Sequence, residues 1–358
     1  MERKDKYMGS EMKYGVPGDV WTVTSAGAQQ VKDLIGKPCT LVSNGKEIKV
    51  QGFFLIDSLP VIQIVTKQGY SVQVSENQPM QAIYDFNSKE QLILWSEGIN
   101  LKNEKLIGLH NHFNYRWDGL SSFEDGYIIG WLIGDGTIVE KCLNSSRLDF
   151  YCDDLALISY CETILQRKVK YNASSDCHYI DGDQLAHLIR QYGLDQEKLI
   201  NRHIESDSFD FYRGFLSAFF DADASVEIKE RRICLAQSNL SRMQATQRML
   251  LRLGIQASLQ EHREAQRRLV HEQICNVSSE YRLRFCHVNC RIFKDIVGFQ
   301  NPMKSLKLLE VLASTTKQSR NMFHTEIATI TKIGKKPIYA VLESGKGSFD
   351  ANGFILLM

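Results

Sequence analysis

Two short apolar runs that each end in an acidic residue stand out in the hydrophobic pattern of the chain. The first covers residues 128–136 (IIGWLIGDG) and the second covers residues 216–224 (LSAFFDADA). Each run has two small residues four positions apart, which places both on one face of a helix. These pairs are Gly130 with Gly134, and Ala218 with Ala222. Because small residues let two backbones approach closely, the pattern predicts two buried helices that meet in a tight seam.

Asp135 and Asp223 end these two helices. At a helix C-terminus the macrodipole disfavours an anion by roughly 0.3–1 kcal/mol, so a cation is expected nearby. A divalent metal ion would serve, since hard cations bind carboxylate oxygens. A single run of this kind is more often an ordinary core helix. Two copies that lie 88 residues apart (223 minus 135) favour a repeated functional motif instead.

The two runs resemble the double-motif LAGLIDADG homing endonucleases, in which Asp135 and Asp223 match the positions of metal-binding carboxylates. The second copy is the closer match, although it has Ala218 and Ala224 where glycines are usual. The first copy has Ile133 where a non-catalytic acid often stands. The resemblance implies two αββαββα half-units in one chain. It also implies hydrolysis of double-stranded DNA with Mg²⁺ held by the two acids.

The same resemblance implies one lysine from each half close to the reacting water. The matching blocks are residues 197–200 (EKLI) and 298–304 (GFQNPMK), which assigns Lys198 and Lys304. A cation at that place would favour the negative charge that develops on the phosphate. The alternative for each lysine is an ordinary solvated surface charge.

The segments on both sides of this region have a strand-like pattern. Residues 14–80 are rich in β-branched residues and turn signals, and residues 326–358 have the same texture. The sequence therefore predicts an α+β protein in which helices and hairpins interrupt an all-β unit. The expected domains are 14–115 joined with 322–358, and 122–315 with half-units at about 122–205 and 206–315.

The outer unit resembles the splicing (HINT) domain of inteins, most closely the inteins of ribonucleotide reductases. The matching blocks are residues 18–24 (GDVWTVT), 31–38 (VKDLIGKP) and 348–354 (SFDANGF). Together the resemblances imply a pseudo-symmetric LAGLIDADG repeat pair inserted into a degenerate HINT-like β domain. Splicing needs a Cys or Ser nucleophile, an activating Thr and His, a later His and a terminal Asn. The chain has other residues at these positions: Gly15, Ser75, Gln78, Gly347, Leu357 and Met358.

Those replacements, together with the start Met, predict a free-standing protein that keeps the β fold as a scaffold and no longer splices. The length of 358 residues predicts two domains, and 43% hydrophobic with 24% charged residues is ordinary soluble composition. No apolar run is long enough to cross a bilayer, and no signal segment follows Met1. We expect an intracellular protein, in the cytoplasm or nucleoid, or in the nucleus of a eukaryote.

Nine cysteines without a repeated paired spacing predict reduced thiols. A zinc site is conceivable at Cys286, His287 and Cys290, or at Cys177 and His178. However, the spacing is not that of a zinc finger, and residues 281–290 have the pattern of a strand. Free structural thiols are therefore the favoured interpretation.

The net charge of +1 taken alone would favour a function without nucleic acid. Between residues 229 and 309, however, 15 Lys or Arg stand against 6 Asp or Glu, a local excess of +9 that fits phosphate contacts. Strand-like alternation over residues 225–235 and 269–286 predicts hairpins that enter the major groove. The candidate contacts are Lys229, Arg231, Arg282 and Arg284 in the second half, and Arg147, Asp149, Lys168 and Lys170 in the first.

For each of these residues the alternative is a solvated strand face. A helix over residues 241–255 is predicted to turn Met249 and Leu250 toward the core and Arg248 and Arg252 outward. The expected partner is double-stranded DNA with a long specific target site, cut by a monomer. Two alternatives remain: a catalytically inactive DNA- or RNA-binding remnant or maturase of the same fold, and an active autoprocessing protein.

Overall fold

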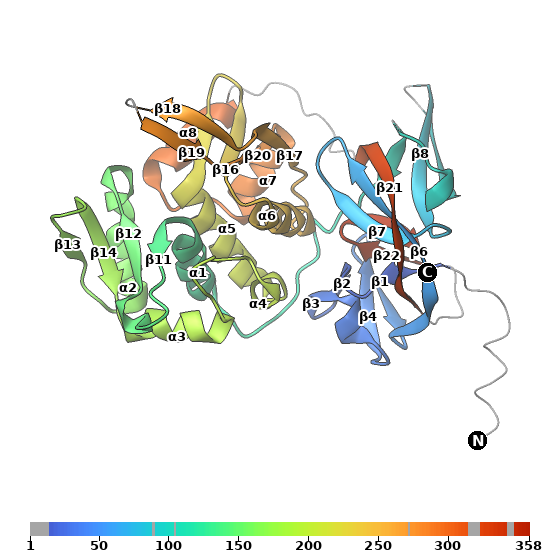
Figure 1. Cartoon of the computed structure of the whole chain (residues 1–358), viewed down its shortest axis with the longest axis horizontal. Coiled ribbons are helices and arrows are strands. Elements are labelled where there is room, and N and C mark those ends of the chain that lie inside the picture. Colours follow the sequence, from blue (N-terminus) through green and yellow to red (C-terminus); the bar gives the residue numbers. More distant parts are fainter. Residues whose placement is uncertain (1–13, 88–89, 104, 271–272, 314–322, 342–346) are drawn as a thin grey trace. The chain divides into compact units, whose positions relative to one another are not determined.

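The computed structural model describes residues 14–87, 90–103, 105–270, 273–313, 323–341 and 347–358. It divides the chain into two compact units. Unit 1 contains residues 1–112 and 323–358, and unit 2 contains the segment between them, residues 113–322. Unit 1 consists of β-sheets and unit 2 of helices and hairpins, so an all-β unit is interrupted by an α+β insertion, as predicted (Figure 1). In the described part of the chain, no helix combines the length and apolar character that a bilayer span requires.

Unit 1 is built around two very long paired strands. β6 (Phe53–Thr66) and β21 (His324–Val341) run antiparallel from the Ile327–Thr66 pair to the Val341–Phe53 pair. They join the two chain segments of the unit, because β6 precedes the insertion and β21 follows it. The larger sheet has the order β22-β23-β8-β10-β21-β6-β7, with β1 beside β21 and β9 beside β8. The smaller sheet has the order β3-β2-β4-β5.

The other strands of unit 1 are β1 (Val16–Pro17), β2 (Trp21–Thr24), β3 (Gly27–Gln30), β4 (Cys39–Ser43), β5 (Lys46–Val50), β7 (Ser71–Ser75), β8 (Pro79–Asn87), β9 (Glu90–Glu97), β10 (Leu106–Gly108), β22 (Ser348–Ala351) and β23 (Phe354–Leu357). Apolar residues alternate along β7, where Val72 and Val74 are buried and Ser71 and Gln73 are less so. This alternation is typical of strands with one face against a core.

Unit 2 repeats one order of elements. The first copy runs α1 (Phe123–Asp135), β11 (Gly136–Thr137), β12 (Arg147–Phe150), α2 (Ile158–Leu165), β13 (Lys170–Asn172), β14 (Cys177–Asp181) and α3 (Asp183–Tyr192). The second copy runs α5 (Phe209–Asp223), β15 (Ala224–Glu227), β16 (Arg232–Gln237), α6 (Leu240–Arg252), β17 (Ser258–Arg263), β20 (Glu280–Cys286) and α7 (Val288–Ile296). The short helix α4 (Arg202–Glu205) precedes the second copy.

The two copies form equivalent sheets, β11-β12-β14-β13 and β15-β16-β20-β17. The second copy also has an added hairpin, β18 (Gln266–Val270) with β19 (Gln273–Val277), and a last helix, α8 (Pro302–Ala313). The repeated αββαββα order and its insertion into an all-β unit confirm the predicted fold class. The prediction of a strand over residues 281–290 is correct only in part, because β20 ends at Cys286 and Cys290 lies in α7.

Helices α1 and α5 begin at serines that cap them. The Ser122 hydroxyl accepts a hydrogen bond from the Asp125 N–H at 3.1 Å, and the Asp125 carboxylate accepts one from the Ser122 N–H at 3.1 Å. Such a reciprocal pair satisfies two N–H groups that the first helical turn leaves free. In α5, the Ser208 hydroxyl accepts from the Phe211 N–H at 3.0 Å. Both motif helices therefore start at a residue that stops them from extending further.

The two helices cross at glycine residues, so their main chains touch directly. Gly126 and Gly130 of α1 lie against the backbone of α5, and Gly214 of α5 lies against the backbone of α1. A Cβ atom on any of the three would overlap a carbonyl oxygen of the other helix. Closer to the C-terminal ends, a Cβ on Gly134 would lie 2.6 Å from the Cβ of Ala222. The small-residue pattern thus produces the expected seam.

We expect Gly130→Ala to destabilise unit 2 by at least about 1–3 kcal/mol, because the added methyl group meets the main chain of Phe215, which cannot move aside as a side chain could. Chemical denaturation followed by tryptophan fluorescence measures the change. Glu124→Ala, on the exposed face of the same helix, serves as the control and should stay within about 0.5 kcal/mol of wild type. Equal stability of the two variants would contradict the close approach at Gly130.

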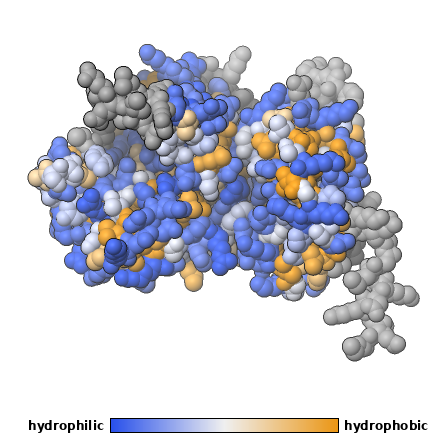
Figure 2. All heavy atoms as spheres, viewed as in Figure 1, coloured by the Kyte–Doolittle hydropathy of each residue, from blue (hydrophilic) through white to orange (hydrophobic). Residues whose placement is uncertain are grey.

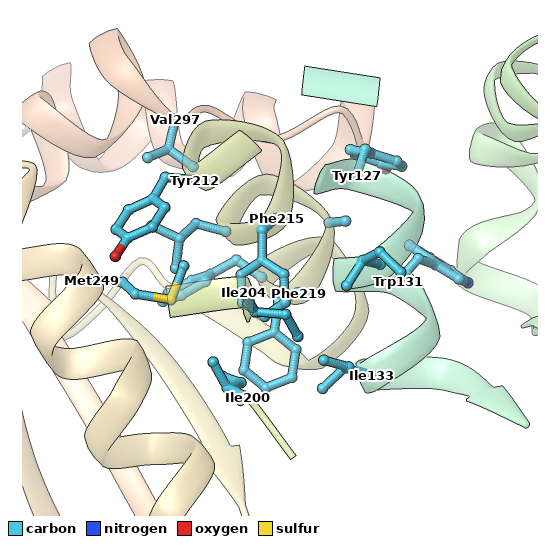
Figure 3. Close-up of a cluster of buried hydrophobic side chains, with 14 of the residues drawn as sticks. Tyr127, Trp131, Ile133, Ile200, Ile204, Tyr212, Phe215, Phe219, Met249 and Val297 are labelled. Atoms are coloured by element: carbon cyan, nitrogen blue, oxygen red, sulfur yellow. The ribbon is translucent and has the colours of Figure 1, made fainter. Parts of the chain in front are cut away.

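The core of unit 2 surrounds this seam. Aromatic side chains from α5 and α1, including Tyr127, Trp131, Phe215 and Phe219, are fully buried around it (Figure 3). Met249 of α6 joins the same cluster, as the helical pattern predicted. Hydrophilic side chains cover most of the visible face of unit 2, whereas apolar side chains gather in patches on the visible face of unit 1 (Figure 2).

The prediction that Arg252 of α6 faces outward is wrong. Its side chain is 4% exposed, and its guanidinium lies 2.9 Å from Glu205 Oε1. Arg248 is also largely buried, and it forms a bidentate pair with Glu205, with both bonds at 2.7 Å. The helical period assigned these arginines to the solvent side, but α4 covers that side and supplies a carboxylate.

Candidate active site

The two motif acids are the last residues of their helices. Asp135 ends α1 and Asp223 ends α5, and both side chains are partly exposed. Asp223 Oδ2 lies 3.0 Å from the point where a Cβ on Gly134 would stand. The acid of one helix therefore reaches the last turn of the other. The glycine at position 134 leaves the space that lets the two carboxylates share one site.

Each helix end is held by one of the predicted lysines. Lys198 Nζ donates to the carbonyl oxygens of Gly134 at 3.2 Å and Gly136 at 2.8 Å. Lys304 Nζ donates to the carbonyl oxygens of Phe220, at 3.3 Å, and Asp221. The bonds to Gly134 and Asp221 satisfy carbonyl groups of the last helical turns, and both lysines place a cation at the negative end of a macrodipole. The structure thus places Lys198 and Lys304 at the ends of the two helices that carry the motif acids.

Burial dominates the electrostatics of this site. Burial, together with the nearby charge of Asp135, raises the pKa of the Asp223 carboxyl to about 7. Burial likewise raises the pKa of Asp135 and lowers the pKa of Lys198 and of Lys304. Two carboxylates that repel each other in partial burial bind a divalent cation readily, because the ion removes both penalties.

Three further polar residues complete the site, and the sequence did not assign them to it. Gln237, the last residue of β16, donates from Nε2 to Asp223 Oδ2 at 2.6 Å. Arg242 near the start of α6 donates to the carbonyl oxygen of Glu197, beside Lys198. Asp149 of β12, a predicted DNA contact, lies near the first acid, and its charge raises the pKa of Asp135.

A shared spacing could have identified two of these residues. Asp149 and Gln237 each lie 14 positions after the acid of their own repeat. Asp149 is buried, accepts a hydrogen bond from Thr137 Oγ1 at 2.7 Å, and forms an ion pair with Arg147 at 2.7 Å. The two halves of the site are therefore chemically different: an amide touches the acid in one half, and a paired carboxylate stands near the acid in the other.

Asp221 connects three elements behind the site. This residue of α5 is fully buried and accepts hydrogen bonds from the backbone N–H groups of Gln300 at 2.9 Å and Asn301 at 3.1 Å, just before α8. The Tyr127 hydroxyl of α1 donates to it at 3.0 Å. Asp221 therefore sets the start of α8, the helix that carries Lys304. In the first repeat the corresponding position is Ile133.

Burial raises the pKa of Asp221 from 3.8 to about 6. The folded protein thus holds this proton more tightly than the unfolded chain does, so its contribution to stability is full below about pH 4 and is lost as the pH rises through 6. We expect the free energy of unfolding to fall by the order of 3 kcal/mol over that range from this group. Urea unfolding between pH 4 and pH 7 measures the slope. Asp221→Asn should flatten it, whereas the exposed control Asp183→Asn should not.

The predicted DNA contacts lie on or beside the two four-stranded sheets. Arg282 and Arg284 alternate along β20, opposite Ala236 and Cys234 of β16. Lys229 and Arg231 lie in the turn between β15 and β16, rather than in a strand. Several candidates already have acidic partners: Arg147 with Asp149 at 2.7 Å, Lys168 with Glu162 at 3.0 Å, Lys170 with Asp181 at 2.7 Å, and Arg282 with Glu280 at 2.6 Å.

The six positions assigned to lost splicing chemistry gather in unit 1. The Gly15 N–H donates to Ser75 Oγ at 2.9 Å, and Gln78 Nε2 donates to the Leu357 carbonyl oxygen at 2.9 Å. The Met358 N–H donates to the Gly347 carbonyl oxygen at 3.0 Å. A Cβ on Gly15 would overlap the carbonyl oxygen of Tyr339, so no nucleophilic side chain fits there without a backbone shift.

Comparison with known proteins finds a family model that matches part of the second repeat. The model of the LAGLIDADG-like domain matches residues 210–288, which run from the first turn of α5 to the start of α7. This range contains Asp223 and Gln237 together with β15, β16, β17 and β20.

Two curated proteins are similar to longer stretches of the chain. The ribonucleoside-diphosphate reductase NrdEB subunit alpha of Bacillus subtilis is 21% identical over 388 residues, covering 95% of this chain and 35% of that protein. The replication factor C small subunit of Methanocaldococcus jannaschii is 26% identical over 282 residues, covering 75% of this chain and 14% of that protein. The chain thus spans about a third of the length of the first relative and less of the second.

Among solved structures, I-DmoI in complex with DNA and Ca aligns with a TM-score of 0.38 and 13% identity, covering 52% of this chain and 97% of that one. The Ssp DnaB mini-intein variant M86 aligns with a TM-score of 0.23 and 17% identity, covering 28% of this chain and 67% of that one.

Proposed function

We propose that unit 2 is a site-specific endonuclease that hydrolyses phosphodiester bonds of double-stranded DNA with a divalent metal ion. The observation that carries this proposal is the pairing of Asp135 and Asp223, one from each repeat, at the C-terminal end of a seam of small residues. A lysine stands behind each acid. The match of residues 210–288 to the LAGLIDADG-like domain supports the same conclusion.

The donor set of the site fits Mg²⁺. Asp135 and Asp223 offer carboxylate oxygens, the ligands that hard cations prefer, and no thiol or imidazole faces them among the contacts of the described residues. Both acids have a raised pKa, which an ion between them would lower. When bound there, Mg²⁺ would supply a water of lowered pKa and a charge that steadies the leaving oxygen.

The residues of the chain would divide the remaining tasks. Lys198 and Lys304 hold the two helix ends and place positive charge where the phosphate becomes more negative. Gln237 keeps Asp223 in one orientation through its bond to Oδ2. Asp221 fixes the start of α8 and thereby the place of Lys304.

DNA would lie against the two sheets of the repeats. Arg282 and Arg284 point along one face of β20, and the turn with Lys229 and Arg231 extends the same sheet. In the first half Arg147, Lys168 and Lys170 each have an acid within 3.0 Å, which a phosphate would have to replace. Two half-sites on one chain would let a monomer read a long asymmetric target.

Cleavage of a random duplex library tests the proposal. Protein with Mg²⁺ should enrich one family of cut sequences, and the metal chelator EDTA should abolish the cutting. If well-folded protein binds duplexes of one sequence and never cuts them, the DNA-binding remnant is the correct interpretation. If it selects single-stranded or folded RNA instead, a maturase function replaces the nuclease.

We further propose that unit 1 is a scaffold without splicing activity. The absence of space for a side chain at Gly15 and the amide of Gln78 in place of an imidazole support this. Mass spectrometry after prolonged incubation with a thiol should find a single uncleaved species of 41.0 kDa. Smaller products whose ends map to Gly15 would contradict the loss of splicing chemistry.

A further inference from the structure

Unit 1 buries a cluster of two histidines and an aspartate that the proposed reactions do not use. His110 is 0% exposed, His112 is 1% exposed and Asp350 is 2% exposed. One ligand atom from each of the three lies within 4.8 Å of the other two. These side chains come from two distant parts of the sequence, the segment after β10 and the strand β22. Burying three such groups together is costly unless each polar atom has a partner.

The hydrogen bonds leave two ring nitrogens without a partner. His112 Nε2 lies 3.2 Å from Asp350 Oδ2, and the Gly353 N–H donates to Asp350 Oδ1 at 3.0 Å. The Asn44 N–H donates to His110 Nδ1 at 3.1 Å. His110 Nε2 and His112 Nδ1 are buried and have no hydrogen-bond partner. Native proteins rarely leave such atoms unsatisfied, so each calls for an explanation.

The buried Asp350 carboxylate relies on a single histidine for a compensating charge. In the part of the chain that the structure describes, Asp350 has His112 as its ion-pair partner, and no lysine or arginine is paired with it. A buried carboxylate needs a positive group close by. A metal ion held by imidazole nitrogens would supply that charge and would also occupy the two free nitrogens.

We propose that His110 and His112 bind one transition-metal ion of the Zn²⁺ type through His110 Nε2 and His112 Nδ1, while Asp350 holds the His112 ring from behind through its contact with Nε2. Imidazole nitrogens are ligands that Zn²⁺ prefers and Mg²⁺ does not. The contact of Asp350 with His112 Nε2 keeps the proton on that nitrogen and leaves Nδ1 free to bind, an arrangement common behind metal-bound histidines.

Ion binding has to move one part of the cluster. The two rings are nearly parallel, with 6° between their planes and 5.1 Å between their centres, so one ring must turn before both nitrogens face one ion. His110 is the ring that turns, because its bond from Asn44 is replaceable. A metal at Nε2 moves the His110 proton to Nδ1, which can then no longer accept from Asn44. The Asn44 amide in the turn at Asn44 and Gly45 should therefore lose its protection against hydrogen exchange when the ion binds.

The place of the site suggests what the ion does. The backbone N–H of His110 donates to the Gly353 carbonyl oxygen at 2.8 Å, and Leu109 forms a β-bridge with Phe354. The cluster therefore lies where the chain leaves unit 1 at residue 112 and close to the hairpin of β22 and β23 that follows the insertion. An ion there would join the two segments that unit 2 separates in the sequence.

Calorimetric titration of the full chain with Zn²⁺ alone tests the proposal. The chain should carry Asp135→Asn and Asp223→Asn, so that the proposed Mg²⁺ site cannot contribute. We expect one ion per chain at neutral pH. His112→Gln should abolish binding, and Asp350→Asn should weaken it about 10- to 100-fold. His203→Gln, which changes an exposed histidine of α4, is the control and should bind as the parent does.

Two further readouts keep the result decisive if one variant folds poorly. Zn²⁺ should raise the midpoint of thermal unfolding of the parent and not that of Asp350→Asn. Hydrogen exchange at the Asn44 amide should become faster when Zn²⁺ is added. Binding that is unchanged in both cluster variants, or no Zn²⁺ binding by the parent, would overturn the proposal and would leave the endonuclease proposal untouched.

Discussion

Replacing either motif acid by its amide, in Asp135→Asn or Asp223→Asn, should reduce DNA cleavage by on the order of 10³-fold or more. The amide keeps the size of the side chain but removes a charge that the divalent ion requires. An ion held by only one carboxylate loses several kcal/mol of its stabilisation of the transition state, and every 1.36 kcal/mol is a factor of ten in rate. Cleavage of a selected target duplex under single-turnover conditions measures the effect.

Binding of the same duplex separates this effect from misfolding. Both variants should bind the target at least as tightly as wild type, because a neutral amide repels phosphate less than a carboxylate does. Asp195→Asn, an exposed acid of unit 2, is the matched control and should cut at the wild-type rate. Cleavage that persists in both motif variants would disprove the assignment of Asp135 and Asp223, even if the protein cuts DNA.

Glu205→Ala should destabilise unit 2 by about 3–5 kcal/mol, the largest effect on stability that we expect from one side chain. Glu205 is 1% exposed and pairs with Arg248 at 2.7 Å and with Arg252 at 2.9 Å. Arg252 also donates to the Tyr212 hydroxyl at 2.8 Å. Removing the carboxylate leaves two largely buried guanidinium groups without their anion, which costs far more than the pair itself contributes.

Urea unfolding measures the loss of stability of Glu205→Ala and of a control variant that breaks a surface ion pair of α5. Asp210→Ala removes the partner of Arg213, at 3.0 Å on the exposed side of α5, and should cost less than about 1 kcal/mol. The triple variant Glu205→Leu, Arg248→Met, Arg252→Met should recover much of the lost stability, since it leaves no charge unpaired. If Glu205→Ala loses as little stability as Asp210→Ala, water reaches Arg248 and Arg252 and replaces the lost carboxylate.

Local patterns were sufficient to predict the parts of the site that repeat. The small residues four apart and the acids that follow them predicted α1, α5 and their seam, because helical spacing alone decides which residues share a face. The same holds for the alternating strands of unit 1. Lys198 and Lys304 were placed only by their blocks, since nothing in their immediate neighbours distinguishes them from surface lysines.

Contacts between distant segments were not predictable in this way. Arg252 is buried because Glu205 lies 47 positions earlier and folds against it, a fact that the period of α6 does not contain. Gln237 and Asp149 were missed as members of the site because they lie in strands and not in the motif helices, although their common spacing from the two acids was available. His110 and His112 are separated from Asp350 by an insertion of 210 residues, so no local pattern shows that they lie together.

The contact of main chain with main chain at Gly126, Gly130 and Gly214 has a consequence for how such a protein can change. Where main chains touch directly, the spacing of the two helices that end in Asp135 and Asp223 is limited by van der Waals contact of their backbones and depends less on which side chains fill the surrounding core. Substitutions in the outer strands can therefore alter the face offered to a partner while the distance between the two acids stays constant. A seam of this kind lets the outer strands diversify while the site of Asp135 and Asp223 keeps its geometry.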